Sequence, residues 1–293
     1  MAPAGPRSTL RGAFMGLADA VPGVSGGTVA LILGIHPRLV ATISSIDGSL
    51  ARQATRLGSA EGRSAFAASW RERDLSFLVW LAIGIAAGVV LGAKLLVGPL
   101  ETVPAIMAAA FLGLVLASIP EPLQRAHRGG AGFWTATVAA LLAFAVTVAP
   151  GLGASSPWLL PFYGAIAVCA MILPGISGSF LLLLLGAYEP VLAAVAALDL
   201  GTLAPFILGA AVGLLAFSRL LKRLLADHGP LTYAAMVGLL VGSVGRLWPW
   251  RSEAGFAAGL PAAPAWADLH WILGAALLGA LLGRGLCALA ERP

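Results

Sequence analysis

The sequence predicts an all-α polytopic membrane protein made of two inverted-topology repeats, each with one re-entrant helical hairpin and three transmembrane helices. Three observations support this fold class: a strongly apolar composition, long apolar stretches, and a Pro-Gly motif that occurs twice. Hydrophobic residues make up 59% of the 293 positions and charged residues 11%, and the mean hydropathy is +0.93. A soluble domain has a far more even balance, so the chain belongs in lipid.

The apolar stretches provide six candidate spans. A transmembrane helix needs about 20 mainly apolar residues to cross a hydrocarbon core of ~30 Å. We expect spanning helices at residues 75–97, 103–119, 132–149, 200–221, 231–247 and 269–290. Small residues at spacing four, as in Gly84-x-x-x-Gly88 and Gly209-x-x-x-Gly213, indicate faces where helices pack closely.

The second half of the chain repeats the first. The segment Val21-Pro22-Gly23-Val24-Ser25-Gly26-Gly27-Thr28 recurs from residue 173 as Leu173-Pro174-Gly175-Ile176-Ser177-Gly178-Ser179-Phe180. Further along, a shift of 125 positions pairs Asp74 with Asp199 and Gly84 with Gly209. We therefore expect one repeat over 1–150, with a re-entrant hairpin at about 11–46, and a second over 151–293, with its hairpin at about 158–198. The Arg-rich and Ser-rich stretch at about 47–73 is predicted to be a cytoplasmic surface loop inserted in the first repeat only.

The basic residues indicate the topology. A Pro-Gly segment that enters the membrane and returns places most Arg and Lys residues on one side, as the positive-inside tendency requires. Lys94, Arg246 and Arg251 are the exceptions. One hairpin plus three spans gives an odd number of crossings, so the second repeat is inverted relative to the first, as in many transporters. Both termini are then cytoplasmic, and Trp158, Trp248, Trp250, Trp266 and Trp271 lie at the outer boundary.

The two Pro-Gly turns are the predicted binding site. Non-helical backbone at membrane depth must be buried or must line a cavity, because its polar groups find no partner in hydrocarbon. Glycine lets a ligand approach the main chain, and the helix that follows each turn begins with N–H groups that favour an anion. Close helix packing is the alternative role for these small residues. The predicted phosphate-binding residues are Pro22, Gly23, Ser25, Gly26, Gly27, Thr28, Pro174, Gly175, Ser177, Gly178 and Ser179.

The first turn also carries a family resemblance. The run Gly12-x-x-Met15-Gly16-x-Ala18-Asp19-x-Val21 through Thr28, continuing to Gly34-Ile35, resembles the signature of the bacterial PopT-type polyprenyl-phosphate translocases, formerly a domain-of-unknown-function family. The resemblance implies a flippase in the bacterial cytoplasmic membrane that returns undecaprenyl phosphate, the lipid carrier of cell-envelope synthesis, to the inner leaflet. The family commonly has Gly-Ile-Tyr-Glu where this chain reads Gly34-Ile35-His36-Pro37, whereas the second half keeps Tyr188-Glu189.

Five charged residues are further candidates for coupling or headgroup contact. Asp19 and Glu189 could couple transport to protons or could serve as capping or interfacial carboxylates. Lys94 and Arg219 match at the shift of 125 and could pass a phosphate along, or could extend from helix ends to the interface. Arg11 could meet the headgroup at the cytoplasmic mouth or act as a positive-inside charge. His36 is expected to be structural, with a proton relay as the alternative.

Other function classes fit the sequence less well. A small-anion channel or carrier remains an alternative, because the turns suit any anion. A prenyl-pyrophosphate phosphatase would need clustered histidines, and His36, His127, His228 and His270 are scattered. Cys169 and Cys287 lack the spacing of a metal or disulfide framework, so we expect no metal and no cofactor. The pI of about 9.9 reflects the cytoplasmic side of a membrane protein rather than nucleic-acid binding.

Overall fold

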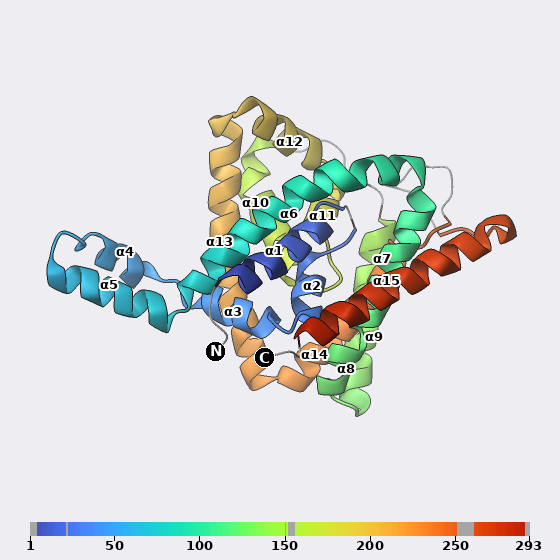
Figure 1. Cartoon of the computed structure of the whole chain (residues 1–293), viewed down its shortest axis with the longest axis horizontal. Coiled ribbons are helices and arrows are strands. Elements are labelled where there is room, and N and C mark those ends of the chain that lie inside the picture. The colour runs from blue at the N-terminus through green and yellow to red at the C-terminus, as the bar shows by residue number, and fades with distance from the viewer. Residues whose placement is uncertain (1–4, 22, 150, 152–155, 251–260, 291–293) are drawn as a thin grey trace.

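The structure is a computed structural model that describes residues 5–21, 23–149, 151, 156–250 and 261–290. All regular elements in these ranges are helices (Figure 1). The helices of the first half are α1 (Pro6–Asp19), α2 (Gly26–Ile32), α3 (His36–Ser44), α4 (Gly48–Ala54), α5 (Ala60–Glu72), α6 (Leu75–Thr102), α7 (Pro104–Ser118), α8 (Pro120–Arg125) and α9 (Gly130–Val148). Those of the second half are η1 (Pro157–Leu159), α10 (Leu160–Ile172), α11 (Gly178–Leu184), α12 (Tyr188–Ala197), α13 (Leu200–Asp227), α14 (Gly229–Ser243), η2 (Trp266–Asp268) and α15 (Leu269–Ala290).

Five helical segments in the described residues are long and apolar enough to cross a membrane, which confirms a multi-pass architecture. They are Leu75–Leu96, Pro104–Arg125, Gly130–Val148, Leu200–Asp227 and Trp266–Ala288. The predicted span at 231–247 is the exception, because α14 has 15 residues and covers only about 22 Å at 1.5 Å per residue. The chain leaves the helix after Ser243 and forms a turn over residues 244–247.

Two helix pairs are sharply broken. The axes of α2 and α3 meet at 116°, and those of α11 and α12 meet at 110°. A glycine with positive φ stands at each break, Gly34 at 65° and Gly186 at 68°. A side chain with a Cβ is strained in this region of backbone space, so glycine allows the chain to reverse within two or three residues.

The two halves share local geometry as well as sequence. The turn glycines Gly23 and Gly175 have φ of 103° and 87°, and Ser25 and Ser177 each cap the helix that follows. The helix lengths also match, with 28 residues in both α6 and α13 and 15 in both α7 and α14. Apart from α4, α5 and α8, for which the described residues of the second half have no counterpart, the duplicated sequence forms α-helices in the same order in both halves.

Glycine faces hold the helix pairs together. Within the halves α1 packs along α6 and α10 along α13, whereas α7 packs on α15 and α9 on α14 across the halves. A Cβ built on Gly84 would lie 2.0 Å from the Thr9 carbonyl oxygen, and one on Gly209 would lie 1.9 Å from that of Pro161. Backbones can approach this closely only without side chains, so both predicted glycine faces are close-packing faces.

The apolar core and the apolar surface divide the helices between two environments. Every residue of α2 is buried, and the largest cluster of buried side chains forms around α2 together with Phe77 and Leu81 of α6. Large apolar side chains on α9, α13 and α15 are exposed instead, among them Leu141, Leu208 and Leu281. This pattern suits outer helices that face lipid around a central hairpin.

The insert at 47–73 lies at the surface, but it is helical, whereas a loop was predicted. Asp47 and Ser59 cap α4 and α5, which extend away from the rest of the molecule (Figure 1). Hydrogen bonds from Ser49 and Arg73 hold the pKa of the Asp47 carboxyl at about 2, below its usual range. Capping residues start helices even in polar sequence, and the polar composition of this stretch had indicated only that it lies at the surface.

The α7–α15 contact gives a direct stability test. A Cβ on Gly279 would lie 1.8 Å from the carbonyl oxygen of Ala110, whereas one on Gly274 of the same helix would meet nothing within 4 Å. Gly279→Ala should therefore force the helices apart and lower the free energy of unfolding by about 1–3 kcal/mol. Gly274→Ala, the matched control, should leave the unfolding midpoint of the detergent-solubilised protein unchanged or slightly raised. Equal midpoints for both variants would contradict this packing.

Candidate functional site

The first turn ends in a helix start whose N–H groups are already bonded. The Oγ of Ser25 accepts from the Gly27 N–H at 3.1 Å, and Oδ1 of Asp19 accepts from the Gly26 N–H at 2.7 Å. A Cβ on Gly26 would lie 2.4 Å from the Asp19 carboxylate, so only glycine fits there. Asp19 thus occupies the capping position that the sequence left open as one of its two roles.

The second turn has related geometry. Ser177 accepts from the Phe180 N–H at 3.4 Å and shares a hydrogen bond of 2.9 Å with the Ser179 hydroxyl. Ser177 and Pro174 are buried, whereas Gly175 and Ser179 are partly exposed. Both turns therefore start their helices with a capping serine in the protein interior.

The two turns meet and satisfy each other's backbone. Ser25 donates its hydroxyl towards the carbonyls of Met171 and Leu173, at 3.4 and 3.3 Å. In the other direction, the Gly175 N–H donates to Oγ1 of Thr28 at 2.9 Å. Segments almost 150 residues apart in the sequence are thereby joined at the point where each helix is interrupted.

Two of the glycines predicted to bind phosphate instead allow backbone segments to pack closely. A Cβ on Gly27 would lie 2.5 Å from the Met171 carbonyl oxygen, and one on Gly178 would lie 2.4 Å from that of Ala167. Both positions match the close-packing alternative. Gly23 and Gly175 line a cavity, although a Cβ on Gly175 would also lie 2.8 Å from the backbone of Leu239.

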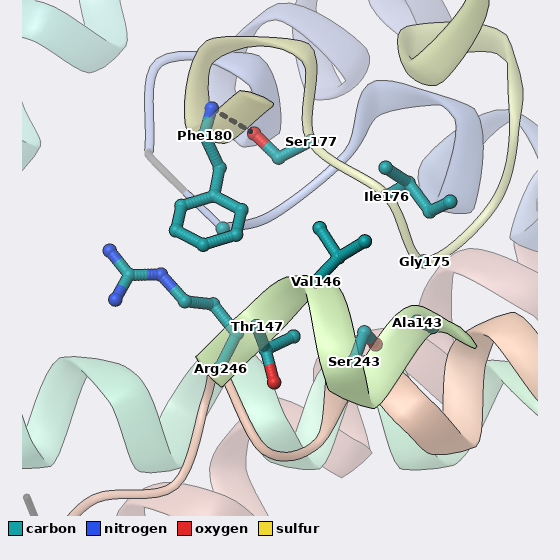
Figure 2. A pocket seen from close by; sticks show the side chains of 10 residues that line it. Ala143, Val146, Thr147, Gly175, Ile176, Ser177, Phe180, Ser243 and Arg246 are labelled. Carbon is teal, nitrogen blue, oxygen red and sulfur yellow. Dashed lines mark hydrogen bonds between the residues drawn. The ribbon is translucent and has the colours of Figure 1, made fainter. Parts of the chain in front are cut away.

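That cavity lies between the turns and the ends of α9 and α14 (Figure 2). Its volume of about 20 Å³ is close to that needed for one water molecule. Its lining combines apolar groups with the hydroxyl groups of Thr147, Ser177 and Ser243 and the guanidinium of Arg246. The lining residues are Gly23, Ala143, Val146, Thr147, Gly175, Ile176, Ser177, Phe180, Ser243 and Arg246.

Arg246 is the residue of this cavity that the sequence did not single out as a site residue. Only 3% of it is exposed, and its guanidinium carbon lies 4.5 Å from the centre of the Phe180 ring. Two signals could have found it: Arg246 is an exception to the positive-inside pattern, and the shift of 125 pairs it with Glu121 rather than with another cation. Phe180 and Thr147 gave no comparable signal, since apolar and hydroxyl side chains are common in spans.

The other predicted charges lie away from the cavity. Glu189, Lys94 and Arg219 are exposed, and Arg11 is partly buried on α1. Arg219 donates to the carbonyl of Ile46, just after α3. Pro22 lies outside the described residues. The structure therefore brings together predicted residues of both turns, and it places none of these four charges among them.

His36 joins the two halves beside the turns. Its ring is fully buried, and Nε2 lies 2.9 Å from the carbonyl oxygen of Ile172, the last residue of α10. Together with Ser25, it gives partners to three consecutive carbonyls at the end of that helix, those of Met171, Ile172 and Leu173. This contact agrees with the structural role expected for His36.

Long apolar helices around two broken helix pairs that meet in the interior define a multi-pass membrane protein. Over residues 15–258 the chain matches the family described as VCA0040-like, undecaprenyl phosphate translocase-like. It is also 39% identical, over 244 residues that cover 83% of this chain and 77% of the other, to a protein of Vibrio cholerae serotype O1 named polyprenyl-phosphate transporter.

The chain therefore belongs to the undecaprenyl phosphate translocase-like family. The resemblance drawn from the first Pro-Gly turn is confirmed by this match. No solved structure matches the chain.

Asp19 gives a test that separates capping from charge. Asp19→Ala should leave the buried Gly26 N–H without its acceptor and lower the free energy of unfolding by about 1–3 kcal/mol. Asp19→Asn keeps a carbonyl oxygen and should stay within about 0.5 kcal/mol of the parent, as measured by unfolding in detergent. A loss of stability in Asp19→Asn as large as in Asp19→Ala would show that the negative charge is required, against a purely capping role.

Proposed function

We propose that the protein is a lipid transporter that returns undecaprenyl phosphate across the bacterial cytoplasmic membrane for reuse in envelope synthesis, and that it is not an enzyme. Membership of the undecaprenyl phosphate translocase-like family and the multi-pass helical architecture support this function. The relative from Vibrio cholerae, named a polyprenyl-phosphate transporter, points to the same class of substrate.

The observation that carries the proposal is the meeting of the two Pro-Gly turns around one cavity. Gly23 of the first turn and Gly175 and Ser177 of the second line it together. The phosphate headgroup passes between these turns, whereas the prenyl tail stays in lipid along the exposed apolar faces of the outer helices. A phosphate is larger than the water-sized cavity, so the two hairpins separate when the headgroup enters.

The proposed mechanism uses two inverted repeats, each with a re-entrant hairpin, and both termini in the cytoplasm. The matched turn glycines, the equal helix lengths and the exchange of α7 and α9 between halves support the repeat. The halves also differ, since α3 packs on α13 with no comparable packing of α12 on α6 among the described helices. Rocking one repeat against the other would break the α3–α13 contact and open the cytoplasmic side.

Translocation in liposomes tests the function. The purified protein is reconstituted with undecaprenyl phosphate, and an external reagent reports how much phosphate becomes accessible with time. Wild type should equilibrate the lipid between leaflets. The Ser25→Ala/Ser177→Ala double variant should slow translocation by about tenfold or more, the factor that corresponds to ~1.4 kcal/mol, because it removes both turn hydroxyls.

Ser118→Ala is the matched control. Ser118 is equally buried, but its hydroxyl donates to the Val115 carbonyl of its own helix, so its loss should leave translocation unchanged. No translocation by the wild type, with or without a pH gradient or a membrane potential, would contradict lipid transport and favour a small-anion carrier. Parental rates in the double variant would contradict the placement of the headgroup at the turns.

A further inference from the structure

Arg246 is a buried cation in the lining of the candidate site, beside Phe180. Burying a charged side chain in the interior of a protein is costly, so a buried arginine points to a use for its charge. We infer that Arg246 is the residue that binds the phosphate monoester headgroup, an inference that rests on the proposed function. The ligand class is a phosphate monoester, whether carried on a lipid or free in solution.

Arg246 is held between the two hairpins. Its guanidinium carbon lies 4.5 Å from the centre of the Phe180 ring of α11, beside which Figure 2 shows it. On the other side, a Cβ on Gly23 would lie 3.0 Å from Cγ of Arg246. The guanidinium contacts the Phe180 ring, and the absence of a side chain at Gly23 leaves room for the stem of Arg246. A phosphate bound by Arg246 would therefore contact both halves of the molecule at once.

The preference of the cavity for an anion comes from Arg246 rather than from the hydroxyl groups beside it. Thr147 and Ser243 donate their hydroxyls to the carbonyls of Phe144 and Leu240 in their own helices, at 2.7 and 2.8 Å. Ser177, which caps α11 and shares a hydrogen bond with the Ser179 hydroxyl, also lines the cavity. No carboxylate lines the cavity among the described residues, so the positive charge of Arg246 sets the preference for an anion.

The two copies of the repeat differ at this position. The equivalent residue in the first half, Glu121, lies in α8 and pairs with Arg125 at 2.6 Å. The second half instead leaves the helix after Ser243, and the turn that follows directs Arg246 to the cavity. The turn after α14, where the first half forms α8, thus accounts for the buried cation, and the inferred phosphate site is asymmetric within a duplicated fold.

Substitutions of Arg246 test the inference in the reconstituted full-length protein. Arg246→Gln should slow undecaprenyl phosphate translocation by ~30-fold or more, because a charged partner of the phosphate is lost. Arg246→Lys keeps the charge but loses the two-pronged geometry of guanidinium. Its translocation rate should therefore lie between those of wild type and Arg246→Gln. Phe180→Leu should weaken transport less than Arg246→Gln does. Arg223→Gln, an exposed cation on α13, should behave as wild type.

A binding measurement separates this inference from the proposed function. Undecaprenyl phosphate in detergent should raise the unfolding midpoint of wild type and of Arg246→Lys, and should leave that of Arg246→Gln unchanged. A second pattern would overturn lipid transport and keep the phosphate site. In that pattern inorganic phosphate alone raises the unfolding midpoint of wild type but not of Arg246→Gln, and wild type does not translocate the lipid. Wild-type translocation together with an undiminished shift in folded Arg246→Gln would overturn the inference and leave the transporter intact.

Discussion

Backbone groups released from a helix inside a membrane must find partners within the protein, and here the two broken hairpins supply them to each other. Ser25 and His36 form hydrogen bonds with the last carbonyls of α10 and the one that follows, and the Thr28 hydroxyl accepts a hydrogen bond from the Gly175 N–H. Without this exchange, several buried polar groups would be unpaired in hydrocarbon, each at a cost of some kcal/mol. This exchange of hydrogen bonds requires small residues in the turns, because a side chain at Gly27 would push α2 away from the end of α10.

This exchange also makes the interior of the protein suitable for a charged headgroup. The turns bring polar groups to membrane depth and seal them from lipid with a fully buried α2. One cavity lies where two glycines, Gly23 and Gly175, face the ends of α9 and α14. The same constraint that stabilises the fold thereby creates a place where a cation such as Arg246 can be buried near polar groups.

Duplication and asymmetry have separate roles in this account. The repeated turns build a common frame, and the copies diverge where the chemistry is specific, at Glu121 in one half and Arg246 in the other. Packing of α3 on α13 is a second difference between the halves. In the proposed mechanism, this difference between the two halves is what alternating access requires, because an exchange of the two arrangements would open the other side.

Much of the fold was predictable because hydropathy and repetition report directly on spans and turns. Five spans, both broken segments and the glycine faces follow from these patterns. The end of α14 was not predictable, because the apolar run continues past Ser243 while the helix does not. The hydrogen bond that the Gly26 N–H donates to the Asp19 carboxylate depends on how the turn folds back over seven residues. Sequence spacing alone does not define that fold.

The candidate site was predictable in part, for a related reason. Ser25, Gly175 and Ser177 come together as the repeated motif indicates, since both copies are built into one interior contact. Arg246 lies outside the motif and lacks a matching cation in the other half, so a search for repeated features passes over it. Its position follows from the turn that the chain forms after Ser243, where the first half continues into α8, and this is a property of the folded chain.

The most direct test of this account is an experimental structure of the protein in a lipid nanodisc with undecaprenyl phosphate bound. The account predicts density for the phosphate between Gly23, Gly175 and Arg246, with the hairpins further apart than in the structure described here and the prenyl chain outside the helices. Phosphate density elsewhere, with the cavity between the turns still closed, would contradict it.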